Sequence, residues 1–131
     1  MNLESPKVSV PKSSQNVFDF LSNVKNFESL MPENISKFEV LDKDKFLFQL
    51  KGMPEIILET KKVIPPNTIV LGAAGGKIDF SLTGTITETS TEASEVQLTF
   101  NGDFNPMMAM MIKGPIKKFI ETLATNIPKT V

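Results

Sequence analysis

The chain has 131 residues, of which 40% are hydrophobic and 22% are charged, and this predicts a soluble globular protein with one domain over residues 1–131. It contains no His, Cys, Trp, Tyr or Arg, which excludes the usual zinc and copper ligands, disulfides and any nucleophile–His catalytic pair within the chain. Its net charge of −1 and scattered lysines argue against nucleic-acid binding, and no apolar run reaches the roughly 18 residues of a membrane span.

The amino-terminal part predicts one strand followed by two short helices. Residues Leu3–Val10 form an edge-type strand, in which Pro6 limits the ladder hydrogen bonds because it has no N–H group. Ser13 is a plausible N-cap for a helix over Ser14–Ser22, whose apolar residues recur at steps of three and four. A second short helix follows over Val24–Leu30. Two helices joined almost directly form a V that can cradle another element.

From Ile35 to Phe104 the hydrophobic pattern changes to a period of two. This period is typical of strands in an antiparallel sheet that has one face in water. Turn signals separate the strands at Gly52-Met53-Pro54, at Pro65-Pro66-Asn67 and in the polar run Glu88–Ser94. These signals predict six strands, which begin near Ile35, Lys45, Glu55, Thr68, Lys77 and Glu95.

The last third of the chain predicts a long helix over Asn105–Ile127 with one apolar stripe. Because Pro115 has no N–H group and crowds the preceding turn, we expect either a kink at Gly114-Pro115 or a short first helix and a main helix from Pro115. The helix start is rich in methionine, and Met107 and Met110 fall on its solvent side. Clustered methionines favour an adaptable, incompletely filled site, and plain core packing is the alternative.

Glycines occur in two settings that predict different structures. Gly84 and Gly102 interrupt bulky inward faces of strands, so we expect them either to leave room above the sheet or to mark bulges. The segment Gly72–Lys77 is glycine-rich and ends in a lysine, but no Ser or Thr follows that lysine. A strand rather than a helix comes next, so this segment predicts a hairpin turn and not a phosphate-binding loop.

The candidates for a carboxylate site are Glu55, Glu59 and Asp79. Their spacing places them at outward or rim positions of the sheet, where neither catalysis nor metal binding is favoured. Without histidine, proton transfer near neutral pH needs a carboxylate or lysine with a strongly shifted pKa. We therefore expect no cofactor, no metal and no catalytic residue, and the sequence argues against an enzyme.

The order of these elements is a strand, two short helices, six strands and a long helix, which predicts an α+β fold. Seven twisted antiparallel strands curve strongly, so the long helix can lie in the concave side of the sheet. Three sequence features carry a resemblance to a known superfamily: Val8-Ser9-Val10-Pro11 leading to Val17-Phe18-Asp19-Phe20-Leu21, then Leu30-Met31-Pro32, and the Pro115–Leu123 helix.

Over essentially its whole length, the chain resembles the START/Bet v 1-like (SRPBCC) superfamily of helix-grip proteins. It is similar to the group that includes small polyketide cyclase/dehydrase-like and CoxG-like members. This resemblance implies a curved seven-stranded antiparallel sheet wrapped around the C-terminal helix, with two short helices after the first strand. It also implies an internal cavity for lipids, polyketides, sterols or other apolar ligands.

The residues and the resemblance together predict binding or carriage of a hydrophobic small molecule between sheet and helix. We expect the ligand to contact inward-facing residues of the strands and of the helix stripe: Phe46, Phe48, Leu58, Phe80, Leu82, Phe100, Met108, Met111, Ile112, Ile116 and Phe119. Two alternatives stay open. One is a protein-interaction module or homodimer that uses Met107 and Met110, and the other is a polyketide cyclase/dehydrase-like enzyme. The amino terminus lacks the pattern of a signal peptide, so we expect a cytoplasmic protein.

Overall fold

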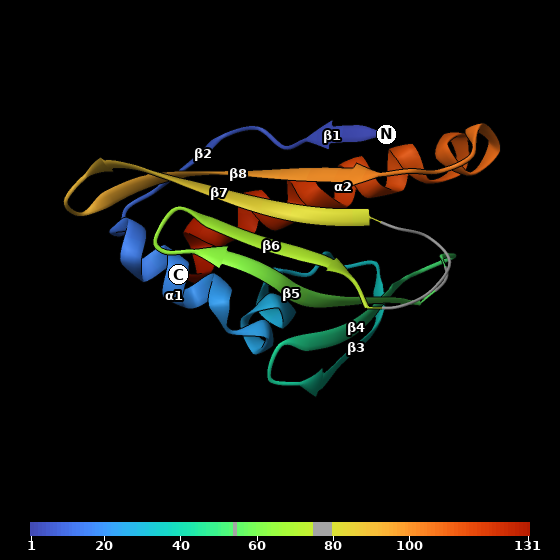
Figure 1. The fold of residues 1–131 in the computed structure, drawn as a ribbon, viewed down its shortest axis with the longest axis horizontal. Coiled ribbons are helices and arrows are strands. Elements are labelled where there is room, and N and C mark those ends of the chain that lie inside the picture. Colours follow the sequence, from blue (N-terminus) through green and yellow to red (C-terminus); the bar gives the residue numbers. More distant parts are fainter. Residues whose placement is uncertain (54, 75–79) are drawn as a thin grey trace.

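The computed structural model describes residues 1–53, 55–74 and 80–131. Within these ranges, eight strands and three helices follow one another along the chain (Figure 1). Their order matches the α+β prediction: β1 (Asn2–Glu4), β2 (Val8–Val10), α1 (Ser14–Ser22), η1 (Val24–Leu30), β3 (Ile35–Asp42), β4 (Lys45–Leu50), β5 (Ile56–Ile64), β6 (Thr68–Ala73), β7 (Phe80–Ser90), β8 (Ala93–Gly102) and α2 (Pro106–Thr130).

The strands of the described residues form one antiparallel sheet in the order β1-β8-β7-β6-β5-β4-β3. The predicted first strand is divided in two, and both β1 and β2 pair with β8. The sheet therefore has eight strands in seven positions. Figure 1 shows α2 lying along one face of this curved sheet, which confirms the helix-grip arrangement.

The break in the first strand is explained by one additional residue before Val8. Glu4 pairs with Thr99 and Val8 pairs with Val96, so three residues on the first strand face two on β8. Pro6 interrupts the ladder here because it has no N–H group. The buried hydroxyl of Ser5 takes over by accepting the Leu98 N–H at 2.9 Å, and the Ser5 N–H donates to the Leu98 carbonyl at 2.8 Å. The sequence predicted a loss of ladder hydrogen bonds at Pro6, and the structure accommodates this loss as a bulge.

The two short helices have the predicted limits. Ser13 caps α1 by accepting the N–H of Asn16 at 3.2 Å, and η1 is a 3-10 helix over the expected residues. The end of α2 packs against η1, where the Asn126 side-chain amide donates to the Leu30 carbonyl at 2.9 Å. Buried residues of α1, η1, the sheet and α2 together make the hydrophobic core.

The long helix α2 is continuous from Pro106 to Thr130, so the expected division at Gly114-Pro115 into two helices is wrong. Pro115 is exposed, and the carbonyl of Met111 that loses its partner lies on an exposed turn, where water can satisfy it. Asn105 caps the start of α2 by accepting the Met108 N–H at 2.8 Å. The helix also extends three residues beyond the expected end at Ile127.

The turns agree with the sequence pattern in two of three places. The backbone of Gly52 has a φ of 83°, and the Asn67 N–H closes the proline turn onto the Ile64 carbonyl at 2.8 Å. Pro54 lies outside the described residues. The turn expected over Glu88–Ser94 is shorter, because β7 continues to Ser90 and β8 begins at Ala93. None of the helices in residues 1–53, 55–74 and 80–131 is long and apolar enough to cross a membrane.

Candidate ligand-binding site

A cavity of about 1080 Å³ lies between the inner face of the sheet and the first half of α2. Side chains from β4 to β8 line one side, and α2 lines the other. The turn after β4 and the segment before β5 complete the rim. Its apolar lining is Phe48, Leu50, Met53, Ile56, Ile57, Leu58, Ala73, Ala74, Phe80, Leu82, Phe100, Phe104, Met108, Met111, Ile112, Pro115, Ile116 and Phe119.

The lining is apolar because the apolar face of the strands and the apolar stripe of α2 both face the cavity. On the strands, alternate residues such as Leu82 and Phe100 point inward and are 3% and 6% exposed. On α2, the stripe at three- and four-residue steps brings Ile116 and Phe119 to the sheet side. Both patterns are visible in the sequence, and the fold places them face to face.

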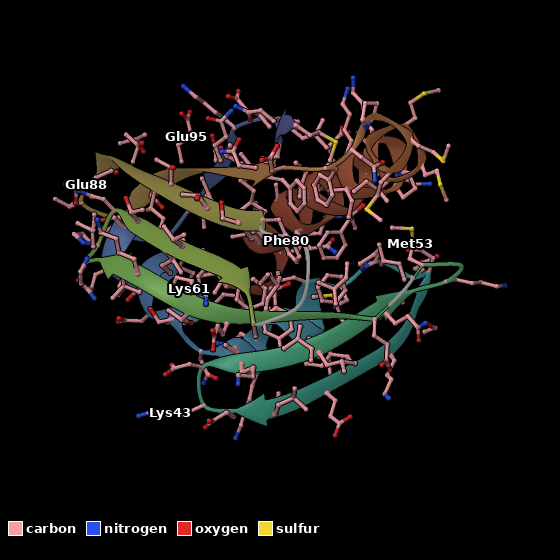
Figure 2. The ribbon with its side chains drawn as sticks, turned by 45° about the vertical axis from the view of Figure 1, so that its right-hand side comes forward. Lys43, Met53, Lys61, Phe80, Glu88 and Glu95 are labelled. Carbon is pink, nitrogen blue, oxygen red and sulfur yellow. The ribbon has the colours of Figure 1, made fainter. Side chains whose placement is uncertain are left out.

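Stacked aromatic rings border the cavity on two sides. Phe48 of β4 stacks on Phe119 of α2 with ring centroids 4.8 Å apart and an interplanar angle of 7°. On the other side, Phe80 stacks on Phe100 at 5.7 Å, and Phe100 stacks on Phe104 at 6.1 Å. Figure 2 shows Phe80 and Met53 at the same end of the molecule, near the start of α2. These contacts hold the aromatic walls in fixed positions around the cavity.

Of the eleven residues expected to contact a ligand, all except Phe46 line this cavity. Phe46 has the same inward orientation as Phe48 but lies nearer the start of β4, beneath η1. Its ring is 0% exposed and stacks between Phe27 at 5.2 Å and Phe38 at 5.3 Å. That end of the sheet is covered by the V of short helices, so Phe46 belongs to solid core.

Several cavity residues were absent from the expected set. Ile56 and Phe104 continue the inward alternation of β5 and β8, so their periodicity could have identified them. Ala73 also continues the inward alternation of β6 after Ile69 and Leu71, whereas Met53 carried no such signal. Met53 lies in the turn after β4, and Ala73 is small, at the end of β6. Their place at the cavity follows from the position of the turn and from the curvature of the sheet.

The methionine-rich start of α2 forms the rim of the cavity rather than its interior. Met107, Met110 and Met111 are 75%, 84% and 71% exposed, which confirms the solvent side expected for Met107 and Met110. Met111 also contributes to the lining, so it lies at the mouth, whereas Met108 is half-buried. In Figure 1 this part of α2 extends past the end of β8.

The space in the cavity does not come from the inward glycines, and neither glycine marks a bulge. Gly84 pairs regularly with Leu98, and Leu21 of α1 packs above it, since a Cβ there would lie 4.0 Å from the Leu21 Cδ1. Gly102 pairs with Phe80, and a Cβ on Gly102 would overlap the ring of Phe104. Both expectations for these glycines were therefore wrong. Neighbouring side chains fill the space that each glycine provides.

Polar groups reach the cavity only at its mouth, among the residues that the structure describes. They are Asn34, Lys51, Glu55 and Lys118, all exposed. Glu55 pairs with Lys37 at 3.0 Å, and this hydrogen bond raises the pKa of Lys37.

Of the other two candidate carboxylates, Glu59 does not line the cavity. Glu59 pairs with Lys61 at 2.6 Å on the outer side of β5, and this hydrogen bond lowers the pKa of Glu59. Asp79 lies outside the described residues, as does the part of the Gly72–Lys77 segment after Ala74. No group of three or more acidic side chains that could hold a metal ion occurs within residues 1–53, 55–74 and 80–131.

No protein-family model and no curated protein matches this sequence, but solved structures match its fold. Norcoclaurine synthase from Thalictrum flavum, in complex with dopamine and hydroxybenzaldehyde, has a TM-score of 0.73 at 12% identity, over 98% of this chain and 84% of that chain. A START superfamily protein from Mycobacterium smegmatis has a TM-score of 0.70 at 11% identity, over 99% of both chains. A protein from Thermus thermophilus has a TM-score of 0.76 at 11% identity, over 99% of this chain and 96% of that chain.

At these identities the similarity establishes the fold. The chain has the START/Bet v 1-like helix-grip fold, as its sequence resemblance predicted. The function depends on the residues of this cavity, since one fold supports many functions.

Proposed function

We propose that this protein binds or carries a hydrophobic small molecule in the cavity between the sheet and α2. The observation that carries this proposal is the cavity itself, which has a volume of about 1080 Å³ and a predominantly apolar lining. Small-molecule sites in proteins are typically about 300–1,000 Å³. Protein interiors otherwise hold few voids larger than a water molecule, so a cavity of this size favours a binding role over plain core packing.

The affinity would come from burial of apolar surface. Transfer of apolar surface from water contributes about 25 cal/mol per Å², or about 0.8 kcal/mol for each buried methylene group, before the costs of ordering the ligand. The walls formed by Phe48, Phe100 and Phe119 supply flat surfaces for rings or chains. Met108 and Met111 supply flexible side chains that adapt to different shapes at the mouth.

A titration with Nile red, a neutral apolar dye, tests the proposed function directly. We expect its fluorescence to rise and shift to shorter wavelength with saturation at one dye per chain, because the cavity removes the dye from water. Mass spectrometry of protein purified from its source under native conditions would then identify a natural ligand. Absence of saturable binding for Nile red and for fluorescent fatty acids would contradict the proposal.

A second candidate function is interaction with another copy of the chain or with another protein. It is favoured by Met107, Met110 and Met111, whose side chains are exposed together on one part of α2. If this surface mediates a homodimer, ultracentrifugation should show a concentration-dependent dimer that Met110→Glu converts to monomer. A monomer at every concentration would contradict the homodimer.

Catalysis of the cyclase/dehydrase kind is a weaker candidate. A general acid or base must reach the reacting atoms of the substrate, and burial or neighbouring charge must adjust its pKa. Among the described lining residues, the ionisable ones are Lys51, Glu55 and Lys118, and all three are exposed at the mouth. We therefore propose binding without chemistry, by one domain over residues 1–131 in the cytoplasm.

A further inference from the structure

The ionisable groups described at the cavity mouth come from three different segments. Lys51 follows β4, Glu55 precedes β5 and Lys118 lies on α2. The Glu55 carboxylate already forms an ion pair with Lys37, with the Lys37 Nζ 3.0 Å from the Glu55 Oε2. In the part of the chain that the structure describes, neither Lys51 nor Lys118 forms an ion pair. Within residues 1–53, 55–74 and 80–131, the mouth therefore presents two lysines that have no ion-pair partner.

Both lysines are fixed at the mouth by their backbone. The Lys51 N–H donates to the Asn34 carbonyl at 2.9 Å, next to the turn at Gly52. Lys118 lies on α2 one residue before Phe119, whose ring faces the cavity. Their side chains are long and exposed, so the ammonium groups can turn toward a head group without leaving water.

Among the described residues, the interior of the cavity offers no comparable charged group. Beyond the mouth, the described lining consists of Phe, Leu, Ile, Met and Ala side chains. A polar or charged group buried there would lose its hydration without gaining a hydrogen-bond partner, which is costly. A ligand with one polar end is therefore oriented with its tail inside and its head at the mouth.

We infer that the ligand is an amphiphile with an apolar tail and an anionic head group, such as a carboxylate or a phosphate. This inference rests on the proposed function and specifies the ligand of the same cavity. The head group lies in water between Lys51 and Lys118, and the tail lies against the phenylalanine walls. A cationic head group would be repelled by both lysines, and a neutral one would gain no charge–charge attraction from them.

The expected preference is modest because both lysines are exposed. Ion pairs in water contribute little each, so two of them strengthen binding by about three- to tenfold over a neutral head group. Salt screens exposed charges, so the preference should shrink as the salt concentration rises. Tail burial supplies most of the affinity in either case.

Displacement of Nile red by four matched dodecyl compounds, each below its micelle concentration, tests the inference. Dodecanoate and dodecyl phosphate represent the two sources of an anionic head, while dodecanol is neutral and dodecyltrimethylammonium is cationic. We expect one or both anions to displace the dye at about three- to tenfold lower concentration than dodecanol. The cation should be the weakest competitor. The anion that displaces best identifies the source of the head group.

Two double variants separate the mouth lysines from general charge effects. In Lys51→Gln with Lys118→Gln, the advantage of the anions over dodecanol should disappear while dodecanol competes as before. Lys113→Gln with Lys117→Gln removes the same charge from exposed positions of α2 outside the cavity lining, and it should keep the advantage.

Equal displacement by dodecanol and the anions, or an advantage that survives in the first variant, would overturn the inference and leave the proposed function intact. Failure of Nile red to bind would overturn both.

Discussion

Replacing Phe46 with alanine should lower the free energy of unfolding by about 3–5 kcal/mol, the usual cost of removing a fully buried ring. The Phe46 side chain is 0% exposed, and it stacks on Phe27 and Phe38 with centroid distances of 5.2 and 5.3 Å. Its ring also meets Phe48 in a tilted arrangement at 6.0 Å. The substitution removes these contacts and leaves a void that the surrounding strand and helix cannot close. Such a loss is large for a domain whose total stability is about 5–15 kcal/mol.

Urea unfolding followed by circular dichroism measures this effect, with stability extrapolated to water. Leu41→Ala is the matched control, because Leu41 lies on the neighbouring strand β3 and is 43% exposed. It should change stability by no more than about 0.5 kcal/mol. Since Phe46 does not line the cavity, the folded variant should bind Nile red as the parent protein does. A loss below about 1 kcal/mol would show that this end of the core is not packed as described.

Phe46 and Phe48 also show where sequence reasoning reaches its limit. Both alternate with polar or outward residues on β4, so their shared inward orientation was predictable from period two. Their different surroundings were not. Phe48 meets the cavity and Phe119, whereas Phe46 meets the ring of Phe27 from η1. Periodicity gives the face of a strand, but the helix that covers each part of that face is determined by tertiary packing.

The same distinction applies to the ends and breaks of the elements. The caps at Ser13 and Asn105 were predictable, because a side-chain oxygen at these positions accepts a free N–H of the first turn. The continuity of α2 through Pro115 was not predictable. Pro115 removes a backbone hydrogen bond, and local rules treat that loss as a break in the helix. Buried anchors that follow it, from Ile116 onward, and solvent around the exposed turn make the cost tolerable.

The volume of the cavity could be expected only from the family resemblance. The sequence identified the methionine-rich rim and the inward phenylalanines, but not the distance between sheet and helix. Gly84 and Gly102, which suggested room above the sheet, are covered by Leu21 and Phe104. The free space instead lies beside small residues at strand ends, such as Ala73, where the curved sheet separates from α2.

Ala73→Phe should reduce the affinity for Nile red by about ten- to seventyfold, because the added ring fills space that a ligand would use. Ala73 follows Ile69 and Leu71 in the inward alternation of β6, pairs with Leu58 and lines the cavity. A ring at this position takes on the order of 60–100 Å² of apolar contact away from the ligand, or about 1.5–2.5 kcal/mol. The ring enters the cavity rather than packed core, so stability should be unchanged or slightly higher.

Val70→Phe is the control for a bulky ring on the same strand. Val70 lies on the opposite face of β6, between Lys62 and Thr83, and does not line the cavity. It should leave dye affinity within about twofold of the parent, a difference of about 0.4 kcal/mol. Titration of both variants, with urea unfolding in parallel, separates occlusion of the cavity from loss of folded protein. Unchanged dye affinity in well-folded Ala73→Phe would show that the dye binds elsewhere, for which the exposed methionines of α2 are the next surface to test.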